Sequence, residues 1–263
     1  MNKALLSLIL VLIFSSTLFS RDGVFSLSTA FVGMGMDYRE YDDNGAILDS
    51  EKSSLNWIIG SEFIFDYTVV YENNNYAQLG VEVLILRGNT EYVGSFIGSN
   101  LGYGSLVSTT KNTVSDIAGF YMYTHVFDNG LDLGYGLALG HRSWKRILSA
   151  SQVEVYYWYS LRPRVKLTYK LGGLSIATLA EYQYGINPKM SATGFSSDFK
   201  LGSANIAKLK IPLKYELNEK LGFFVEYVYE HQIIEKSNVQ SGFFEPDSTA
   251  NNQYVKIGAI FKF

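Results

Sequence analysis

The sequence predicts an all-β protein: a transmembrane, antiparallel, up-and-down β-barrel of ten strands, with eight strands as the alternative. Apolar residues recur at every second position in many segments, which is the period of a strand with one apolar face. Hydrophobic residues make up 47% of the chain and aromatic residues 15%, yet no stretch offers the roughly 20 continuous apolar residues of a spanning helix. The chain also ends in an alternating apolar strand that closes on Phe263. Such a strand would promote aggregation in water, so it favours contact with lipid.

Residues 1–20 are expected to be a signal peptide. A basic start at Lys3 is followed by an uncharged apolar run from Ala4 to Phe14, which is too short to span a bilayer. A buried helix is the alternative interpretation. Residues 21–263 then form the predicted barrel, with no second domain.

The overall composition excludes several classes of site. The chain has no cysteine, which excludes disulfides, thiolate chemistry and lipid attachment through an N-terminal cysteine. The formal net charge of −3 argues against nucleic acid as a partner. No spacing typical of a metal site or a nucleotide-binding loop appears, so we expect no metal and no cofactor.

The first five strands are assigned by the face that their apolar residues share. The expected ranges are about 25–40, 54–70, 76–88, 115–127 and 131–142. The shared faces carry Ala30, Val32, Met34, Met36 and Tyr38 in the first; Leu55, Trp57, Ile59, Phe63, Phe65 and Tyr67 in the second; Ala77, Leu79, Val81, Val83 and Ile85 in the third; and Leu131, Leu133, Tyr135, Leu137 and Leu139 in the fifth. The fourth segment has aromatic residues on both faces, which keeps the eight-strand alternative open.

The last five strands oppose an apolar face to a charged one. They are expected at about 153–169, 174–186, 204–217, 221–234 and the tail from 254. Each apolar stripe covers roughly the 9–11 residues that a tilted strand needs to cross a bilayer. Pro163 and Pro212 fall inside two of these strands. Because proline cannot donate to a ladder, each predicts either a bulge or a shifted strand boundary.

The connections alternate between short and long. Short turns are expected at 71–75, 128–130, 171–173 and 218–220, and long loops near 41–53, 89–114, 143–152, 187–203 and 236–252. Short turns on one side and long loops on the other are the asymmetry of an outer-membrane barrel, whose long loops lie outside the cell.

Charged strand residues lie mostly on the face opposite the apolar one, which places them in the lumen. The predicted lumen charge cluster is Arg142, Glu154, Arg162, Arg164, Lys166, Lys208, Lys210, Lys214, Glu226 and Glu230. Simple hairpin registers would pair Arg142 with Glu154 and Asp132 with Arg164. They would likewise pair Lys214 with Glu226 and Lys210 with Glu230. The cluster predicts a salt-bridged interior that fills a narrow barrel. The alternative is an anion-attracting constriction built on Arg162, Arg164, Lys166, Lys208 and Lys210.

The C-terminal segment resembles the assembly signal of bacterial outer-membrane β-barrel proteins. Lys256, Gly258, Phe261 and Phe263 match its spacing of a polar residue, a glycine and two aromatics. The resemblance implies the outer membrane of a Gram-negative bacterium. It also implies contact with outer-membrane lipid and lipopolysaccharide, and recognition of the last strand by the outer-membrane assembly machinery.

The strand count also resembles the omptin proteases, but their activity is not carried over. That family uses an Asp-x-Asp pair and an Asp-x-His pair, and this chain has no Asp-x-Asp. Its nearest echo of the second pair is Glu230-His231, whose adjacent side chains point to opposite faces. His141 and His231 are expected on the outer face. A Ser-His-acid triad could be drawn from Ser143, His141 and a carboxylate, but a chain with so many serines offers such a match by chance. We therefore predict no catalytic residues and no enzyme.

The long loops carry the remaining functional signal. Exposed aromatic residues among polar ones suit recognition of a surface partner, or they pack over the barrel mouth as a lid. The aromatic residues are Tyr92, Phe96 and Tyr103 in one loop, which also carries Leu101, and Phe243 and Phe244 in another, which also carries Pro246. The sequence predicts a monomer with a structural or surface-recognition role. A narrow, porin-like, anion-favouring pore is the alternative, and a rim-located hydrolase or acyltransferase is the third hypothesis.

Overall fold

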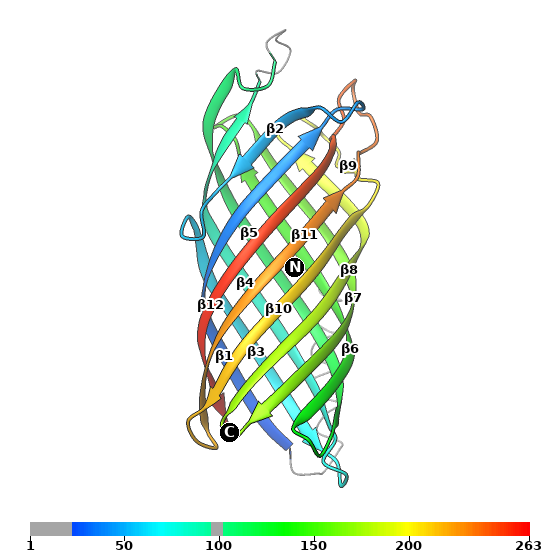
Figure 1. The fold of residues 1–263 in the computed structure, drawn as a ribbon. Helices are drawn as coiled ribbons and strands as arrows, with labels where there is room; N and C mark the ends of the chain where they lie inside the picture. Colours follow the sequence, from blue (N-terminus) through cyan, green and yellow to red (C-terminus); the bar gives the residue numbers. More distant parts are fainter. Residues whose placement is uncertain (1–22, 96–101) are drawn as a thin grey trace.

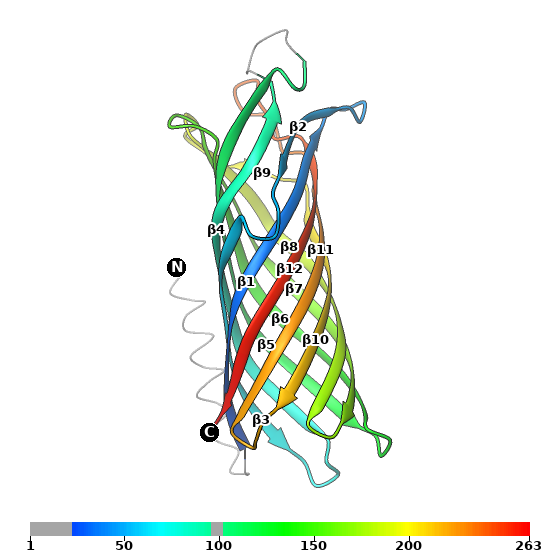
Figure 2. The ribbon, with the colours of Figure 1, turned by 60° about the vertical axis from the view of Figure 1, so that its left-hand side comes forward.

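The computed structural model describes residues 23–95 and 102–263, so the expected signal peptide lies outside the described residues. The fold is a closed, tilted antiparallel barrel of ten long strands with two short added ones (Figure 1, Figure 2). The long strands are β1 (Gly23–Tyr41), β3 (Ile58–Val70), β4 (Tyr76–Gly94), β5 (Leu106–Val126), β6 (Leu131–Ile147), β7 (Val153–Leu171), β8 (Leu174–Ala192), β10 (Ala204–Glu216), β11 (Leu221–Ile234) and β12 (Asp247–Lys262). The ten-strand prediction is confirmed, and the eight-strand alternative is wrong.

The two short strands lie at one end of the barrel. They are β2 (Ile47–Lys52), which pairs with β1 and β4, and β9 (Phe199–Lys200), which pairs with β8. This end carries the longer loops and is called the loop end below. The opposite end carries the tight turns predicted from the sequence, and it is called the turn end. Across residues 23–95 and 102–263, no helix is long and apolar enough to cross a membrane.

The first and last strands close the barrel. β1 pairs with β12 from Ser26↔Lys262 to Tyr41↔Asp247. Gly258 is needed at this seam, because a Cβ there would lie 2.3 Å from the Thr29 carbonyl oxygen and 2.6 Å from the Phe224 ring.

An apolar belt runs around the outside of the barrel, between its two ends. Its outward side chains include Phe31, Phe63, Ile85, Val165 and Ile257, which are between 46% and 62% exposed. Aromatic rings gather at its turn end, where Phe25 packs on Phe65 at 5.7 Å and on Tyr67 at 4.6 Å between ring centroids. Exposed apolar side chains around a whole barrel are the surface that hydrocarbon covers in membrane barrels.

Beyond this belt, the strands continue into segments that the sequence predicted as loops. β6 runs to Ile147, so its connection to β7 is only 148–152 rather than 143–152. The loops expected near 89–114, 187–203 and 236–252 shrink in the same way to 95–105, 193–203 and 235–246, with β9 inside the second, while the 41–53 segment contains β2. The alternation continues there, but many outward residues become polar, while apolar and aromatic residues join a few charged ones inside. On β1, Met34 and Met36 point inward while Asp37 and Arg39 point outward.

Pro163 and Pro212 cause neither bulges nor strand boundaries. Pro163 pairs with Leu137 on β6, but the ladder from β7 to β8 skips it between Leu161↔Tyr184 and Arg164↔Glu181. The ladder from β10 to β8 skips Pro212 in the same manner. The register is the same on both sides of each gap, so the wall tolerates each proline by leaving pairs out of one ladder.

Both predicted hairpin registers are wrong. Arg142 lies opposite Trp158 rather than Glu154, and Asp132 opposite Thr168 rather than Arg164. In the other hairpin, Glu230 lies opposite Lys208 rather than Lys210, and Glu226 opposite Pro212 rather than Lys214. The predicted registers assumed that opposite charges sit directly across one hairpin. The turns instead set the registers, and most charge partners come from strands across the lumen.

Candidate functional site: the charges inside the barrel

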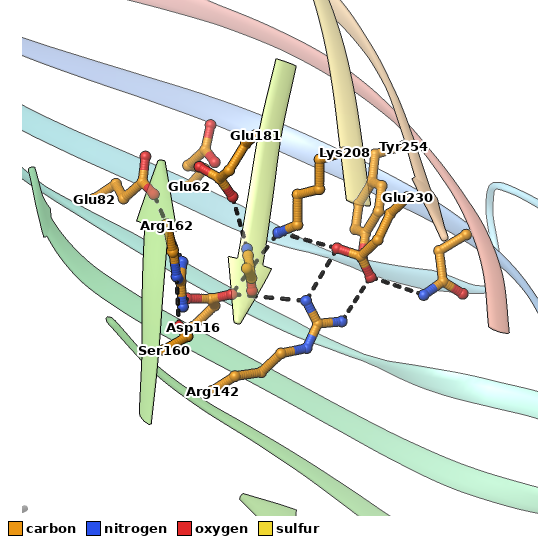
Figure 3. A network of polar contacts seen from close by, with 12 residues as sticks. Glu62, Glu82, Asp116, Arg142, Ser160, Arg162, Glu181, Lys208, Glu230 and Tyr254 are labelled. Atoms are coloured by element: carbon orange, nitrogen blue, oxygen red, sulfur yellow. Dashed lines mark hydrogen bonds and ion pairs between the residues drawn. The ribbon is translucent and has the colours of Figure 1, made fainter. Parts of the chain in front are cut away.

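The interior of the belt region is a network of charged side chains from nine of the ten long strands; Figure 3 shows part of it. The two-residue period points every second side chain inward, so each strand contributes one or two charges at a similar height. The cations come from β6, β7, β10 and β12, and the carboxylates come from β3, β4, β5, β8 and β11. The network therefore joins opposite walls of the barrel.

Glu230 on β11 is the centre of one half of the network. Arg142 on β6 donates two hydrogen bonds to it, at 2.8 and 3.0 Å, in a bidentate pair. The Lys208 ammonium lies 3.0 Å from the same carboxylate, and the Asn252 amide and the Tyr254 hydroxyl donate to it at 2.9 and 3.0 Å. Glu230 is fully buried, so its charge depends on these partners.

Arg162 and Arg164 on β7 form the other half. Arg162 donates to Asp116 on β5 at 2.7 Å and to the Ser160 hydroxyl at 2.7 Å. Arg164 bridges Glu82 on β4 and Glu181 on β8, with its Nε 2.5 Å from Glu181. Asp116 also lies 3.7 Å from Arg142, which links the two halves.

Lys256 on β12 extends the network toward the turn end. Its ammonium lies 2.7 Å from Glu62 and 2.8 Å from Glu226. With Lys210, which lies 4.0 Å from Glu82, the network holds six cations and six carboxylates, and each has an opposite charge within 4.0 Å. The interior of the belt is thus electrically neutral.

The structure brings together seven of the ten residues in the predicted lumen cluster. Glu154 is separate from them, because it pairs with Arg146 at 3.0 Å at the loop end. Lys166 and Lys214 line a vestibule of about 330 Å³ at the turn end, apart from the network. By contrast, the space within the network, lined by Arg162, Lys208 and Lys256 among others, measures only about 30 Å³.

Sequence analysis missed part of the network. Glu62, Glu82, Asp116 and Glu181 were not recognised as its partners, although their inward parity was available. Lys256 was assigned only to the assembly signal.

Above the belt, the loop end has an aromatic interior around one cation. Arg146 lies over the rings of Tyr38, Trp144 and Tyr156, at 4.6, 5.3 and 5.8 Å from their centroids. Its guanidinium also reaches Glu40 at 2.8 Å and Glu51 at 2.9 Å. Tyr38 and Trp144 pack edge to face at 5.0 Å, and Trp144 stacks on Tyr156 at 5.1 Å.

Two more carboxyl groups lie beside Arg146. Glu245, from the loop between β11 and β12, accepts a hydrogen bond from Tyr156. Asp49 on β2 accepts one from Tyr92 at 3.1 Å. Burial, together with the negative charge of Glu40, raises the pKa of Asp49 to about 9. Asp49 is therefore neutral at physiological pH.

Some aromatic residues of the long loops are buried, as a lid would require, and others are exposed, as recognition of a partner would require. Tyr92 belongs to β4 and is buried, whereas Tyr103 is 48% exposed; Phe96 and Leu101 lie outside the described residues. Phe243 and Phe244 are half exposed on the 235–246 loop. Their neighbour Glu245 points inward, so the loop caps the barrel and presents aromatic rings at the same time.

The histidines lie on the outer wall. The His141 ring contacts Tyr159 at 5.1 Å, and His231 Nδ1 lies 2.9 Å from the Asn251 side-chain oxygen. Glu230, the sequence neighbour of His231, is inside the lumen, so the two cannot act together. Over the described part of the chain, no group of three or more His, Asp or Glu side chains is arranged to hold a metal ion.

The last strand places its predicted signal residues on two faces. Lys256 and Gly258 point inward, while Phe261 and Phe263 are 40% and 75% exposed on the outer surface. The aromatic residues therefore lie where lipid or another protein can reach them.

No protein-family model and no curated protein matches the sequence. Solved structures do resemble the fold. The outer membrane protease OmpT from Escherichia coli aligns at a TM-score of 0.57 and 12% identity, over 93% of this chain and 98% of that one. The translocator domain of the autotransporter NalP from Neisseria meningitidis gives 0.45 and 11% identity, over 95% and 92% of the two chains. OprG from Pseudomonas aeruginosa gives 0.41 and 12%, over 92% and 97%. The chain has the fold of the bacterial outer-membrane β-barrel proteins.

Proposed function

We propose that the protein is an integral outer-membrane barrel that does not conduct, and that it holds a structured loop end outside the cell for surface recognition. The apolar belt and the fold support the location in the outer membrane. The predicted signal peptide and C-terminal signal supply the route there, through secretion and the outer-membrane assembly machinery. The turn end faces the periplasm and the loop end faces outward, as the loop asymmetry of such barrels requires.

The filled interior carries the proposal. A conducting pore needs continuous water, and an anion-selective one needs cations without partners. Of the five cations in the pore hypothesis, Arg162, Arg164, Lys208 and Lys210 are each matched by a carboxylate. The fifth, Lys166, lies apart from them in the turn-end vestibule. The space between the four paired cations measures only about 30 Å³, against about 330 Å³ in the turn-end vestibule. Above the network, Tyr38, Trp144 and Tyr156 pack around Arg146 inside the lumen.

The anchored cap supports a recognition role. The 235–246 loop is held by Ser237–Glu245 and Gln240–Phe243 backbone hydrogen bonds and by the inward Glu245. Such a loop presents Phe243 and Phe244 with little ordering cost on binding. The likeness to OmpT extends to the fold alone, so proteolysis is not carried over to this chain.

Single-channel recording in planar bilayers tests the closed barrel. We expect the refolded wild type to insert without steady current, since every constriction charge is paired. The double variant Arg142→Ala/Glu230→Ala removes a pair without changing net charge and should admit measurable current. Steady, anion-selective current through the wild type would overturn the proposal.

Adhesion of cells that display the protein tests the recognition role. Wild-type cells, compared with cells lacking the protein, are applied to arrays of immobilised surface polysaccharides and proteins. The variant Phe243→Ser/Phe244→Ser should lose the adhesion, whereas Val107→Ser, at an equally exposed loop-end position, should keep it. The role is wrong if wild-type cells adhere no better than cells without the protein, or if both variants adhere equally.

A further inference from the structure

Three outward-facing cations form a compact group on the outer wall at the loop end. They are Arg87 on β4, Lys111 on β5 and Lys145 on β6, and all three side chains are exposed. The registers Arg87↔Thr113 and Thr113↔Lys145 place Arg87 and Lys145 on either side of Thr113. Lys111 lies two residues before Thr113 on β5, toward the loop end. Strand spacing puts Arg87 and Lys145 roughly 10 Å apart, and Lys111 roughly 7 Å along the strand.

These cations have no carboxylate partner within ion-pair distance among the described residues. Three other loop-end cations do have carboxylate partners: Arg39 and Lys52 both pair with Asp37, at 3.1 and 3.8 Å, and Lys236 pairs with Asp43 at 2.6 Å. The nearest carboxylate by register is Glu91, which lies opposite Thr109 and so diagonally from Lys111. The group, here called the β4–β6 basic patch, therefore keeps a net positive charge.

The patch begins where the apolar belt ends. On β4 the outward residues Val81, Val83 and Ile85 belong to the belt, and Arg87 is the next outward position. On β6 the outward Leu137 and Leu139 also lie below Lys145, with the outward His141 and Ser143 between them. Lipid packed against this face therefore places its headgroup beside the three cations. The patch rises from the belt edge, so a single layer of phosphates cannot neutralise all of it.

We propose that the β4–β6 basic patch binds the phosphate groups of a multiply phosphorylated glycolipid, the lipopolysaccharide class of the outer leaflet. Charge complementarity carries the assignment, since three cations over this footprint match several phosphates on one headgroup and exceed the one phosphate of a phospholipid. Thr113 and Asn89 lie within the same outward surface and can hydrogen-bond sugar hydroxyls. The site lies on one side of the barrel, so it orients the protein among its lipids. It rests on the proposed outer-membrane location.

Binding to purified lipids in detergent tests the site without depending on that location in the cell. Native mass spectrometry or fluorescence titration compares rough lipopolysaccharide, the same lipid after enzymatic dephosphorylation, phosphatidylglycerol vesicles and free inorganic phosphate. We expect the wild type to prefer intact lipopolysaccharide. The variant Arg87→Gln/Lys111→Gln/Lys145→Gln should bind it at least about tenfold more weakly, because each lost cation weakens attraction to the anionic surface.

Arg39→Gln/Lys52→Gln is the matched control, since it removes loop-end cations that are already paired with Asp37. It should bind like the wild type, and retained heat-modifiable gel mobility verifies that both variants fold. Equal binding by the triple variant overturns the site, as does equal loss in the control or equal binding of dephosphorylated lipid. Equal affinity for phosphatidylglycerol overturns the glycolipid assignment, and equal affinity for free phosphate reduces the patch to a nonspecific anion site. Single-channel recording is independent of all these outcomes.

Discussion

The belt region and the loop end of this barrel are built in opposite ways from the same strands. On β1, Phe25 and Phe31 face outward in the belt while Ser26 and Ser28 face the lumen. Further along the same strand Arg39 faces outward, and Met34, Met36 and Tyr38 fill the interior. Within the belt the outward side chains are apolar; beyond it many are polar, and the interior combines apolar and aromatic side chains with the buried Arg146 and its carboxylates.

This inversion shows that the medium outside the wall decides what the interior must contain. Hydrocarbon outside takes up the apolar side chains, so the lumen receives the charges, which must pair because they are buried. Water at the loop end leaves the apolar residues to pack inside, as in a soluble barrel. Two different kinds of interaction thus hold one continuous wall, and they should respond differently to substitution.

The largest expected effect is the loss of a charge from the belt network. Glu230→Gln would leave Arg142 and Lys208 buried around a neutral amide, and breaking such a pair costs about 3–5 kcal/mol. Denaturant unfolding of the refolded protein in lipid vesicles measures this. Glu216→Gln is the control, because its pair with Lys262 is exposed and should contribute at most about 1 kcal/mol. A similar small loss for both variants would show that the belt network does not hold the barrel.

A cavity in the loop-end interior should act more locally. Met34 is fully buried there, and Met34→Ala should cost about 2–5 kcal/mol where the surroundings cannot collapse. Hydrogen exchange should report faster opening of the upper parts of β1 and β3 and unchanged protection in the belt. Val107→Ala, at a 62% exposed position, should change stability by less than about 0.5 kcal/mol. Equal acceleration throughout the barrel would contradict two separate interiors.

A substitution at the seam between β1 and β12 should impair closure of the barrel. Gly258→Ala forces a methyl group against the Thr29 carbonyl and should cost about 1–3 kcal/mol. Gly119→Ala is the matched control, because a Cβ there meets only the Gly80 oxygen at 3.9 Å. Refolding yield and unfolding midpoints measure both. If Gly258→Ala lowered stability no more than Gly119→Ala, the result would argue against the close packing of β12 on β1 and β11.

The smallest effect concerns pH at the loop end. Because the pKa of Asp49 rises from 3.8 to about 9 on folding, the folded state holds a proton that the unfolded state releases. The stabilisation is complete below pH 3.8 and is lost as the pH rises through about 9. Asp49→Asn mimics the protonated group and should remove this alkaline loosening, measured as protease cleavage of the loop end between pH 7 and 10. An identical pH profile in both proteins would contradict the assignment.

The sequence was sufficient for the strands but not for the charge partners. Alternation located all ten strands, and the turn chemistry around Gly130 and Asn218 located the tight turns, because both signals are local. Arg142 and Glu230 are 88 positions apart on strands that are not neighbours, so no hairpin register could pair them. The upper parts of the strands were missed because an apolar stripe was expected to face outward along its whole length. The two-residue alternation continues through Trp144 and Arg146. It would have extended β6 if apolar residues had been allowed to face inward beyond the belt.

A double-mutant cycle on Arg142 and Glu230 tests the central claim most directly, that opposite walls of the barrel are held together by buried charges across the lumen. The cycle compares Arg142→Met, Glu230→Met and the double variant by unfolding free energy in lipid vesicles. Each single change leaves one buried charge without its main partner, whereas the double change removes both charges. We therefore predict a coupling energy of about 2–3 kcal/mol. Effects that add to within about 0.5 kcal/mol would contradict the claim.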